Sequence, residues 1–119
     1  MKNREIIIEF AGRSYKISYP NVGQFIDIAT RESTLSKGNF KDLILSGLPD
    51  HQEAFGMIKV IAFIEIMLPQ LVKDLKTESL LDLDPVDFEQ ISIAYFDIIL
   101  PWLTEWRTKI QEAPKVDVM

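Results

Sequence analysis

The run Ile61-Ala62-Phe63-Ile64-Glu65-Ile66-Met67-Leu68-Pro69-Gln70-Leu71 returns 32 positions later as Ile93-Ala94-Tyr95-Phe96-Asp97-Ile98-Ile99-Leu100-Pro101-Trp102-Leu103. Six of the 11 positions are identical, and Gln70/Trp102 is the one pair that differs in kind. Each copy is an apolar helical run that carries one acid and is interrupted by proline at the same place. Because proline cannot continue the helical hydrogen-bond ladder, we expect bends at Pro69 and Pro101. Two equivalent bent helices are natural neighbours, and we predict that they pack together.

The similarity fades outside these residues. Helical-repeat families need several stacked copies to bury a continuous core. We therefore favour two helices selected for the same packing task, with an ancient duplication as the alternative.

Two short segments near the N-terminus alternate apolar and polar residues, and one face of the pair carries Ile6, Ile8, Phe10, Tyr15, Ile17 and Tyr19. Ala11-Gly12-Arg13 lies between the segments, and glycine supplies the positive φ that a tight turn needs. We predict a β-hairpin over residues 4–19. Its apolar face must be covered by helices or by another chain, because a lone hairpin is only marginally stable in water.

Capping signals mark the helix starts: Asn21 with Gln24, Asp50 with Glu53, and Asp84-Pro85 followed by Asp87. We predict helices over about 21–32, 39–46, 50–76 and 84–112, followed by an extended tail over 113–119. The third helix is apolar almost all round and should form the centre of the fold. In the last helix we expect a buried stripe of Phe88, Ile91, Tyr95, Ile98, Trp102, Trp106 and Ile110. The predicted fold class is α+β and predominantly α, with one domain over residues 1–112.

The composition fits a soluble globular protein, with 119 residues, 47% hydrophobic and 26% charged. The longest apolar run, Met57 to Leu68, is 12 residues, whereas a membrane-spanning helix needs about 20. The N-terminus has no pattern of a secretory signal, and the absence of cysteine excludes a disulfide framework. We expect a cytoplasmic protein that does not associate with membranes.

The net charge of −5 is unevenly distributed. Residues 1–20 carry a net charge of +2, whereas the segment between Lys76 and Arg107 holds seven acids and no base. Such an acidic surface repels phosphate backbones, so nucleic-acid binding is disfavoured. A solvated helix face explains the acids most simply, and contact between unlike ends of neighbouring molecules is the alternative.

No motif indicates catalysis, a cofactor or a metal. His51 is the only histidine, and without cysteine it cannot build a usual zinc site. The acids from Asp82 to Glu89 lack the glycine of a calcium-binding loop and are better explained as helix caps. A hydrolase that uses these acids is the least favoured hypothesis. No glycine-rich phosphate motif exists, so we expect a protein that is not an enzyme.

Two tryptophans one turn apart, Trp102 and Trp106, precede Arg107 in the last helix. Tryptophan and arginine are common in interface hot spots, so these residues could form an exposed patch that binds a partner. Burial of both tryptophans in the core is the alternative. We add Val116 and Val118 of the tail as candidate partner-binding residues.

The order of the elements suggests a family. The hairpin Glu5-Ile6-Ile7-Ile8-Glu9-Phe10-Ala11-Gly12-Arg13-Ser14-Tyr15-Lys16-Ile17, the helix with Phe25-Ile26 and the late helix opened by Asp84-Pro85-Val86-Asp87-Phe88 resemble the layout of small structural and tail proteins of tailed bacteriophages, particularly tail assembly chaperones. The resemblance implies a non-catalytic protein that binds other phage proteins during assembly in the host cytoplasm or within the virion.

This resemblance makes a virion adaptor or assembly chaperone our first hypothesis. Its partners would be phage structural proteins or further copies of itself in a ring, because head-to-tail contacts close when the rotation permits. A small regulatory or inhibitor protein that docks on a host enzyme is the alternative hypothesis.

Overall fold

The computed structural model describes residues 4–112, which form a two-stranded hairpin followed by helices. The elements are β1 (Glu5–Phe10), β2 (Arg13–Ser18), α1 (Val22–Leu35), α2 (Phe40–Leu45), α3 (Pro49–Met67), α4 (Pro69–Asp74), the 3-10 turn η1 (Leu80–Asp82), α5 (Pro85–Ala94), the π-helical turn η2 (Tyr95–Ile99) and α6 (Leu100–Glu112). The fold is α+β and predominantly α, as the sequence predicts. The predicted tail, 113–119, lies outside the described residues.

The hairpin turn consists of two residues. Ala11 and Gly12 have φ angles of 52° and 78°, and positive φ at both central positions is typical of a type I′ turn, whose twist matches that of the strands. Phe10 pairs with Arg13, so Arg13 belongs to β2 rather than to the turn.

The apolar face of the hairpin is confirmed. Ile8 lies opposite Tyr15 in the antiparallel register, and both side chains are buried together with Ile17, whereas Ile7 on the other face is exposed. Alternation at period two therefore predicts correctly which side chains point toward the helices.

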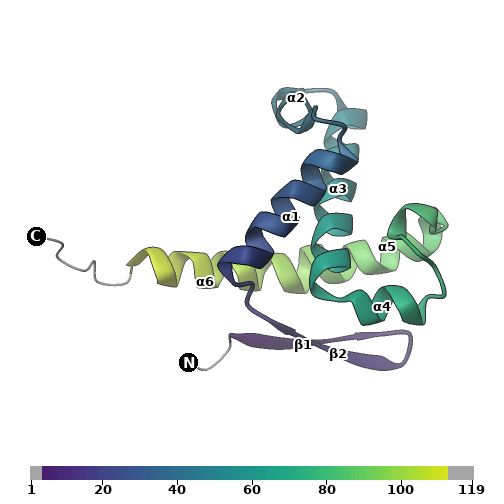
Figure 1. Ribbon diagram of the computed structural model, residues 1–119, viewed down its shortest axis with the longest axis vertical. Coiled ribbons are helices and arrows are strands. Elements are labelled where there is room, and N and C mark those ends of the chain that lie inside the picture. Colours follow the sequence, from purple (N-terminus) through teal and green to yellow (C-terminus); the bar gives the residue numbers. More distant parts are fainter. Residues whose placement is uncertain (1–3, 113–119) are drawn as a thin grey trace, which may run out of the picture.

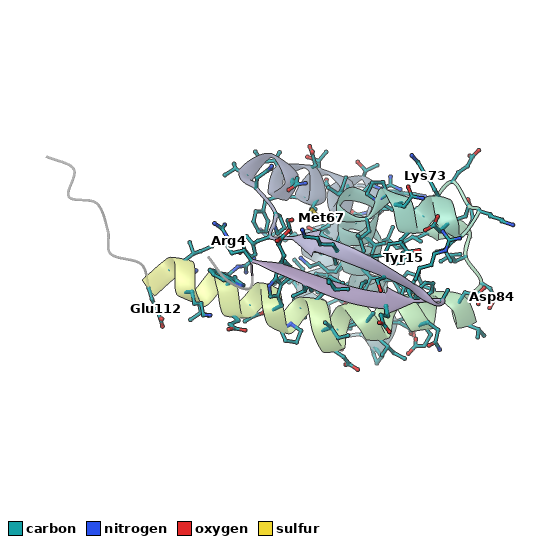
Figure 2. The ribbon with its side chains drawn as sticks, turned by 90° about the horizontal axis from the view of Figure 1, so that it is seen from below. Arg4, Tyr15, Met67, Lys73, Asp84 and Glu112 are labelled. Atoms are coloured by element: carbon teal, nitrogen blue, oxygen red, sulfur yellow. The ribbon has the colours of Figure 1, made fainter. Side chains whose placement is uncertain are left out.

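The helices form two limbs. α1 and α3 pack side by side as one limb, with α2 at its far end (Figure 1). α5, η2 and α6 follow one another as a rod that crosses the other end of this limb (Figure 1). The hairpin lies at the opposite end of the molecule from α2, and the view from below shows it stretched along the rod (Figure 2).

Helices hold both ends of the hairpin. Near the turn, the Tyr15 hydroxyl donates a hydrogen bond of 2.7 Å to Oδ2 of Asp74, and Arg13 forms an ion pair of 3.1 Å with Oδ1. At the open end, the ring of Tyr19 meets that of Trp102 edge-on, with centroids 5.7 Å apart. The sequence analysis left open whether helices or another chain cover the apolar face of the hairpin. Helices α4 and α6 of the same chain contact it.

The two copies of the 11-residue run pack against each other. Phe63 and Tyr95, which occupy equivalent positions, are in edge-to-face contact with ring centroids 5.6 Å apart. The five consecutive residues from Val60 to Ile64 are all buried, so the helix that is apolar all round lies at the centre, as predicted.

The two prolines have different effects on the backbone. At Pro69 the chain leaves the helix, because Leu68 has φ −133° and ψ 60°, and α4 starts afresh with proline in its first turn. Before Pro101 the helix widens instead, and the Leu100 N–H bonds to the Tyr95 carbonyl, five residues back. The wider π turn makes room for a ring that would clash with the carbonyl four residues earlier in an α-helix.

The π turn changes which residues of the last helix are buried, so the predicted stripe is wrong at Ile98. Ile99 is buried and Ile98 is exposed, because the five-residue turn brings the next residue round to the core. Ile110, near the C-terminal end of α6, is also exposed.

The predicted helix starts are confirmed in two of three cases. Asn21 and Gln24 form the reciprocal capping box, and Asp84 accepts a hydrogen bond from Val86 N–H. The expected cap at Asp50 is wrong. Helix α3 begins at Pro49, which needs no N–H partner at this position, and Asp50 lies in the first turn.

Candidate functional site

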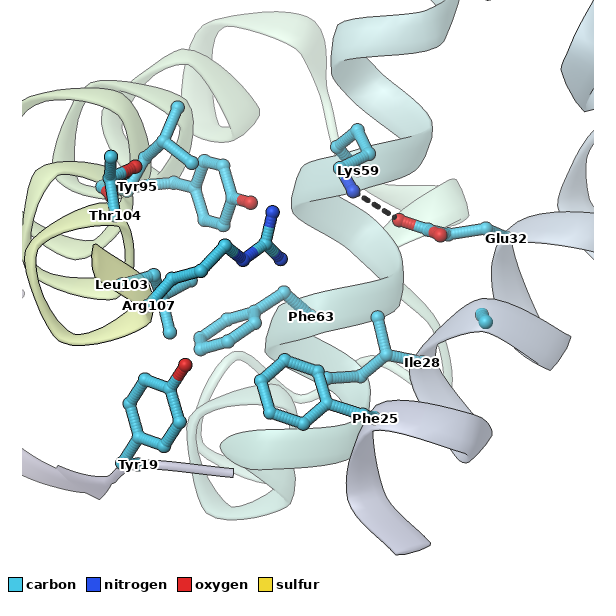
Figure 3. A pocket seen from close by; sticks show the side chains of 12 residues that line it. Tyr19, Phe25, Ile28, Glu32, Lys59, Phe63, Tyr95, Leu103, Thr104 and Arg107 are labelled. Carbon is cyan, nitrogen blue, oxygen red and sulfur yellow. Dashed lines mark hydrogen bonds and ion pairs between the residues drawn. The ribbon is translucent and has the colours of Figure 1, made fainter. Parts of the chain in front are cut away.

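A pocket of about 260 Å³ lies in the corner between α1, α3 and the rod. Its lining is mainly apolar and aromatic, from Tyr19, Phe25, Ile28, Ala29, Phe63, Tyr95, Leu100 and Leu103, and the polar residues Glu32, Lys59, Thr104 and Arg107 complete it. We call these twelve residues the corner pocket (Figure 3). They come from α1, α3, η2 and α6 and from the segment after β2, so only the folded chain brings them together.

One ion pair is built into the pocket wall. Lys59 Nζ lies 2.9 Å from Oε2 of Glu32, and the glutamate side chain is only 9% exposed. The contact has ion-pair distance but not hydrogen-bond direction, so this buried oxygen lacks a hydrogen-bond donor among the described residues. The pair brings no net charge, because each member neutralises the other.

Arg107 adds an uncompensated positive charge. Figure 3 shows its guanidinium reaching from α6 across the pocket, toward Lys59 and Glu32. Within residues 4–112 no ion pair involves Arg107. The pocket therefore carries a net charge of about +1 in a protein whose overall charge is −5.

Tyr95 supplies a neutral hydrogen-bond donor. The residue is 3% exposed, and its hydroxyl points into the pocket beside Arg107 (Figure 3). Burial and, to a smaller extent, the nearby Glu32 carboxylate raise the pKa of Tyr95 to about 12, while Arg107 opposes the shift. No other described residue forms a hydrogen bond with this hydroxyl.

A second cavity adjoins the corner pocket. Its lining shares Tyr19, Phe25 and Arg107 with the pocket and adds Arg4, Pro20, Asn21, Val22 and Ile110. The Arg4 guanidinium lies over the rings of Tyr19 and Trp106, 5.7 and 5.6 Å from their centroids. Together the two cavities form what we call the basic groove, which runs from Arg4 past Arg107 to Lys59; Glu32 is the only acid among the described residues that line it.

Of the residues that the sequence analysis proposed for partner binding, Arg107 is the one that lines the described groove. Trp102 and Trp106 are 7% and 2% exposed, so the alternative of core burial holds and the exposed aromatic patch is wrong. Hairpin residues Tyr19 and Arg4 cover these rings. The remaining candidates, Val116 and Val118, lie outside the described residues.

Sequence reasoning missed Glu32, Lys59 and Tyr95. One signal was present, because Lys59 interrupts the longest apolar run, and a charge inside a helix that is apolar all round needs a partner. Its partner is on another helix, 27 positions away, and nothing local identifies that residue.

A second acid is also held within the fold by other side chains. Glu65 of the first copy accepts hydrogen bonds from Arg31, Ser79 and the Leu80 N–H, at 2.7 to 2.9 Å. It joins α1, α3 and η1, whereas its counterpart Asp97 is exposed. Glu65 therefore has a structural role.

The other residues considered for chemistry are dispersed. His51 is exposed and its Nδ1 lies 2.8 Å from the Ser46 hydroxyl. Within residues 4–112 no three potential metal ligands of the His, Cys, Asp and Glu types cluster together. No described helix combines the length and the apolar character needed to cross a membrane.

Comparison with protein-family models, with curated proteins and with solved structures finds no match to this chain.

Proposed function

We propose that this chain is a non-catalytic protein that binds other protein subunits, and that these subunits are structural proteins of a tailed bacteriophage. The observation that carries the first half of the proposal is the apolar end of the α1–α3 limb. There Ile44, Leu45 and Leu48 are 53%, 72% and 59% exposed. We call these three residues the α2 surface.

Helix α2 is poorly supported within the molecule. It has six residues and none of them is buried. Its main attachment is the ring of Phe40, which stacks on Phe55 of α3 with centroids 5.1 Å apart. Helices this short are unstable alone, and burial of a large apolar side chain contributes roughly 1.5–3 kcal/mol. Covering the α2 surface with a partner would therefore stabilise both the helix and the complex.

The shape of the molecule is consistent with this role. Its radius of gyration is 15.6 Å, compared with about 13 Å for a compact domain of this length. The excess comes from the two limbs, which expose more surface than a sphere and can contact more than one neighbour.

The assignment to a bacteriophage rests on the resemblance of the layout to tail assembly chaperones and related structural proteins. On this proposal the protein acts in the host cytoplasm during assembly and can remain in the virion. The acidic segment between Lys76 and Arg107 would attract the basic N-terminal hairpin of a neighbouring copy, which favours a head-to-tail ring.

The proposal is tested by isolating the particles assembled in cells that express the gene and identifying their proteins by mass spectrometry. Each structural subunit identified in the particles is then purified and mixed with the purified chain, and binding is measured by calorimetry. We expect a complex of defined stoichiometry, and at least a tenfold weaker one with Leu45→Ser. Val86→Ser is the matched control, because Val86 is 72% exposed as well but lies on α5.

Two results would contradict this proposal. If the chain binds no particle subunit and instead forms a stoichiometric complex with a host enzyme, the regulatory hypothesis replaces this one. If Leu45→Ser and Val86→Ser weaken binding equally, the α2 surface is not the contact.

A further inference from the structure

We propose that the basic groove binds an extended segment of a partner protein in which acidic residues alternate with large apolar ones. This inference rests on the proposed function, because it names the kind of partner segment that the protein would recognise. It concerns a surface other than the α2 surface, so the two can fail separately.

The charge of the groove indicates an anionic ligand. Among the described residues that line it, three are cations (Arg4, Lys59 and Arg107) and one, Glu32, is an acid. This excess of positive charge contrasts with the net charge of −5 of the whole chain. Arg107 is the most available of the three, since Lys59 is paired with Glu32 and Arg4 stacks on aromatic rings.

The Tyr95 hydroxyl faces the corner pocket and favours a ligand that places an acceptor oxygen there. Tyr95 is almost fully buried, yet its hydroxyl points into the corner pocket and bonds to no other described residue. Within residues 4–112 this hydroxyl oxygen is not among the buried polar atoms that lack a partner, so it is open to the pocket and accessible to a ligand. A carboxylate placed between this hydroxyl and the Arg107 guanidinium would satisfy both donors, and charge-assisted bonds of this type are short and strong.

The apolar walls favour a carboxylate over a phosphate. A phosphate group carries close to two negative charges at neutral pH, whereas the corner pocket offers about one uncompensated positive charge. Phe25, Ile28 and Phe63 would desolvate the remaining charge without compensation. A carboxylate needs only Arg107, and the same walls accept the large apolar residue that precedes or follows it.

The length of the groove favours a peptide over a small acid. The corner pocket of about 260 Å³ holds roughly one large side chain, and the adjoining cavity of about 520 Å³ continues to Arg4. A segment with two acids, one at Arg107 and one at Arg4, would occupy both cavities. A single-residue ligand would leave the second empty.

The experiment uses the full chain and synthetic peptides. The probe is the acetylated, amidated pentapeptide Phe-Glu-Leu-Glu-Phe, and its control replaces both glutamates by glutamine. Further arms use 3-phenylpropanoate, as a small carboxylate on an apolar body, and inorganic phosphate. Binding is followed by calorimetry and by amide chemical shifts. We expect the acidic peptide to bind at least tenfold more tightly than its glutamine form and than 3-phenylpropanoate.

Three variants assign the binding to the groove. Arg107→Gln should weaken the acidic peptide about tenfold and leave the glutamine peptide unchanged. Lys109→Gln is the matched control, because it removes the same charge from the same helix outside the groove lining. Tyr95→Phe should weaken the acidic peptide several-fold without lowering the melting temperature, since no internal hydrogen bond is lost.

Four outcomes would overturn the proposal: equal affinity for the two peptides, equal loss in Arg107→Gln and Lys109→Gln, tighter binding of phosphate than of the acidic peptide, or no binding of the peptide at all. If Arg107→Gln binds the particle subunit as well as the unmodified chain does, the groove proposal fails while the proposed function stands.

Discussion

Glu65 and Asp97 occupy the same position in the two copies of the 11-residue run, yet the structure gives them opposite surroundings. The Glu65 side chain is 13% exposed and its Oε1 lies 2.8 and 2.9 Å from two nitrogens of Arg31. Its Oε2 accepts bonds from the Ser79 hydroxyl at 2.7 Å and from the Leu80 N–H at 2.9 Å. Asp97 is exposed. We predict that Glu65→Ala strongly destabilises the fold and that Asp97→Ala does not.

The magnitude follows from the contacts. Loss of a hydrogen bond to a charged group costs about 1.5–3 kcal/mol, and removal of one partner from a buried ion pair about 3–5 kcal/mol. Arg31 can return partly to solvent, and these effects overlap, so we expect a loss of about 3 kcal/mol for Glu65→Ala. In a domain of this size that lowers the melting temperature by roughly 12 °C or more. For Asp97→Ala we expect a change within about 0.5 kcal/mol, as for other surface positions.

Equilibrium unfolding in urea measures both values, provided the slope of the transition stays constant. A double-mutant cycle with Arg31→Ala should give a coupling energy of at least about 1 kcal/mol. A loss below about 1 kcal/mol for Glu65→Ala, or equal losses for the two acids, would show that the network around Glu65 does not hold α1, α3 and η1 together.

Three further predictions concern other parts of the fold. The hydrogen bond from Tyr15 lowers the pKa of Asp74, so this carboxylate stabilises the fold fully above its unfolded pKa of about 3.9 and loses that effect as the pH falls through its folded value. Tyr15→Phe should therefore raise the pKa of Asp74 in a carbon-13 NMR titration, and an unchanged titration would contradict the contact. Ala11→Asn should raise the urea midpoint, corresponding to about 0.5 kcal/mol, because asparagine tolerates the positive φ of 52° better than alanine does; a lower midpoint would argue against a type I′ turn. Lys59→Met should cost about 2 kcal/mol in urea unfolding because it leaves Glu32 buried and unpaired, whereas Glu105→Gln, in an exposed pair, should stay within about 0.5 kcal/mol.

Local features of the sequence were sufficient for much of the fold. The hairpin face depends on alternation within six residues, and the helix starts at Asn21 and Asp84 depend on neighbours two or three positions away. The outcome at the prolines was not predictable in the same way. Pro69 starts a new helix that turns toward the hairpin, whereas Pro101 is accommodated by a π turn that keeps the rod continuous. That choice depends on what the following residues can pack against, which the 11-residue run itself does not contain.

The candidate site was less predictable because its parts are far apart in the chain. Glu32, Lys59 and Arg107 lie on three different helices. Glu32 and Arg107 each look like an ordinary surface charge, and the position of Lys59 indicates that it needs a partner without identifying that partner. Arg107 was selected from the sequence for its position beside two tryptophans. The structure instead relates it to Tyr95, three turns earlier along the rod and on the same pocket wall.

The discordant pair of the repeat, Gln70 and Trp102, has a common explanation in the hairpin. Gln70 is exposed on α4 and donates a hydrogen bond of 2.8 Å to Oδ1 of Asp74, the carboxylate that holds the turn end through Tyr15. Trp102 is buried on α6 and packs against Tyr19 at the open end. The two equivalent positions thus serve opposite ends of one hairpin, one through an amide at the rim and the other through an indole in the core. Two helices under the same packing demand can keep ten of 11 positions alike. The hairpin that crosses them meets each helix at a different depth, so the one remaining pair, Gln70 and Trp102, differs.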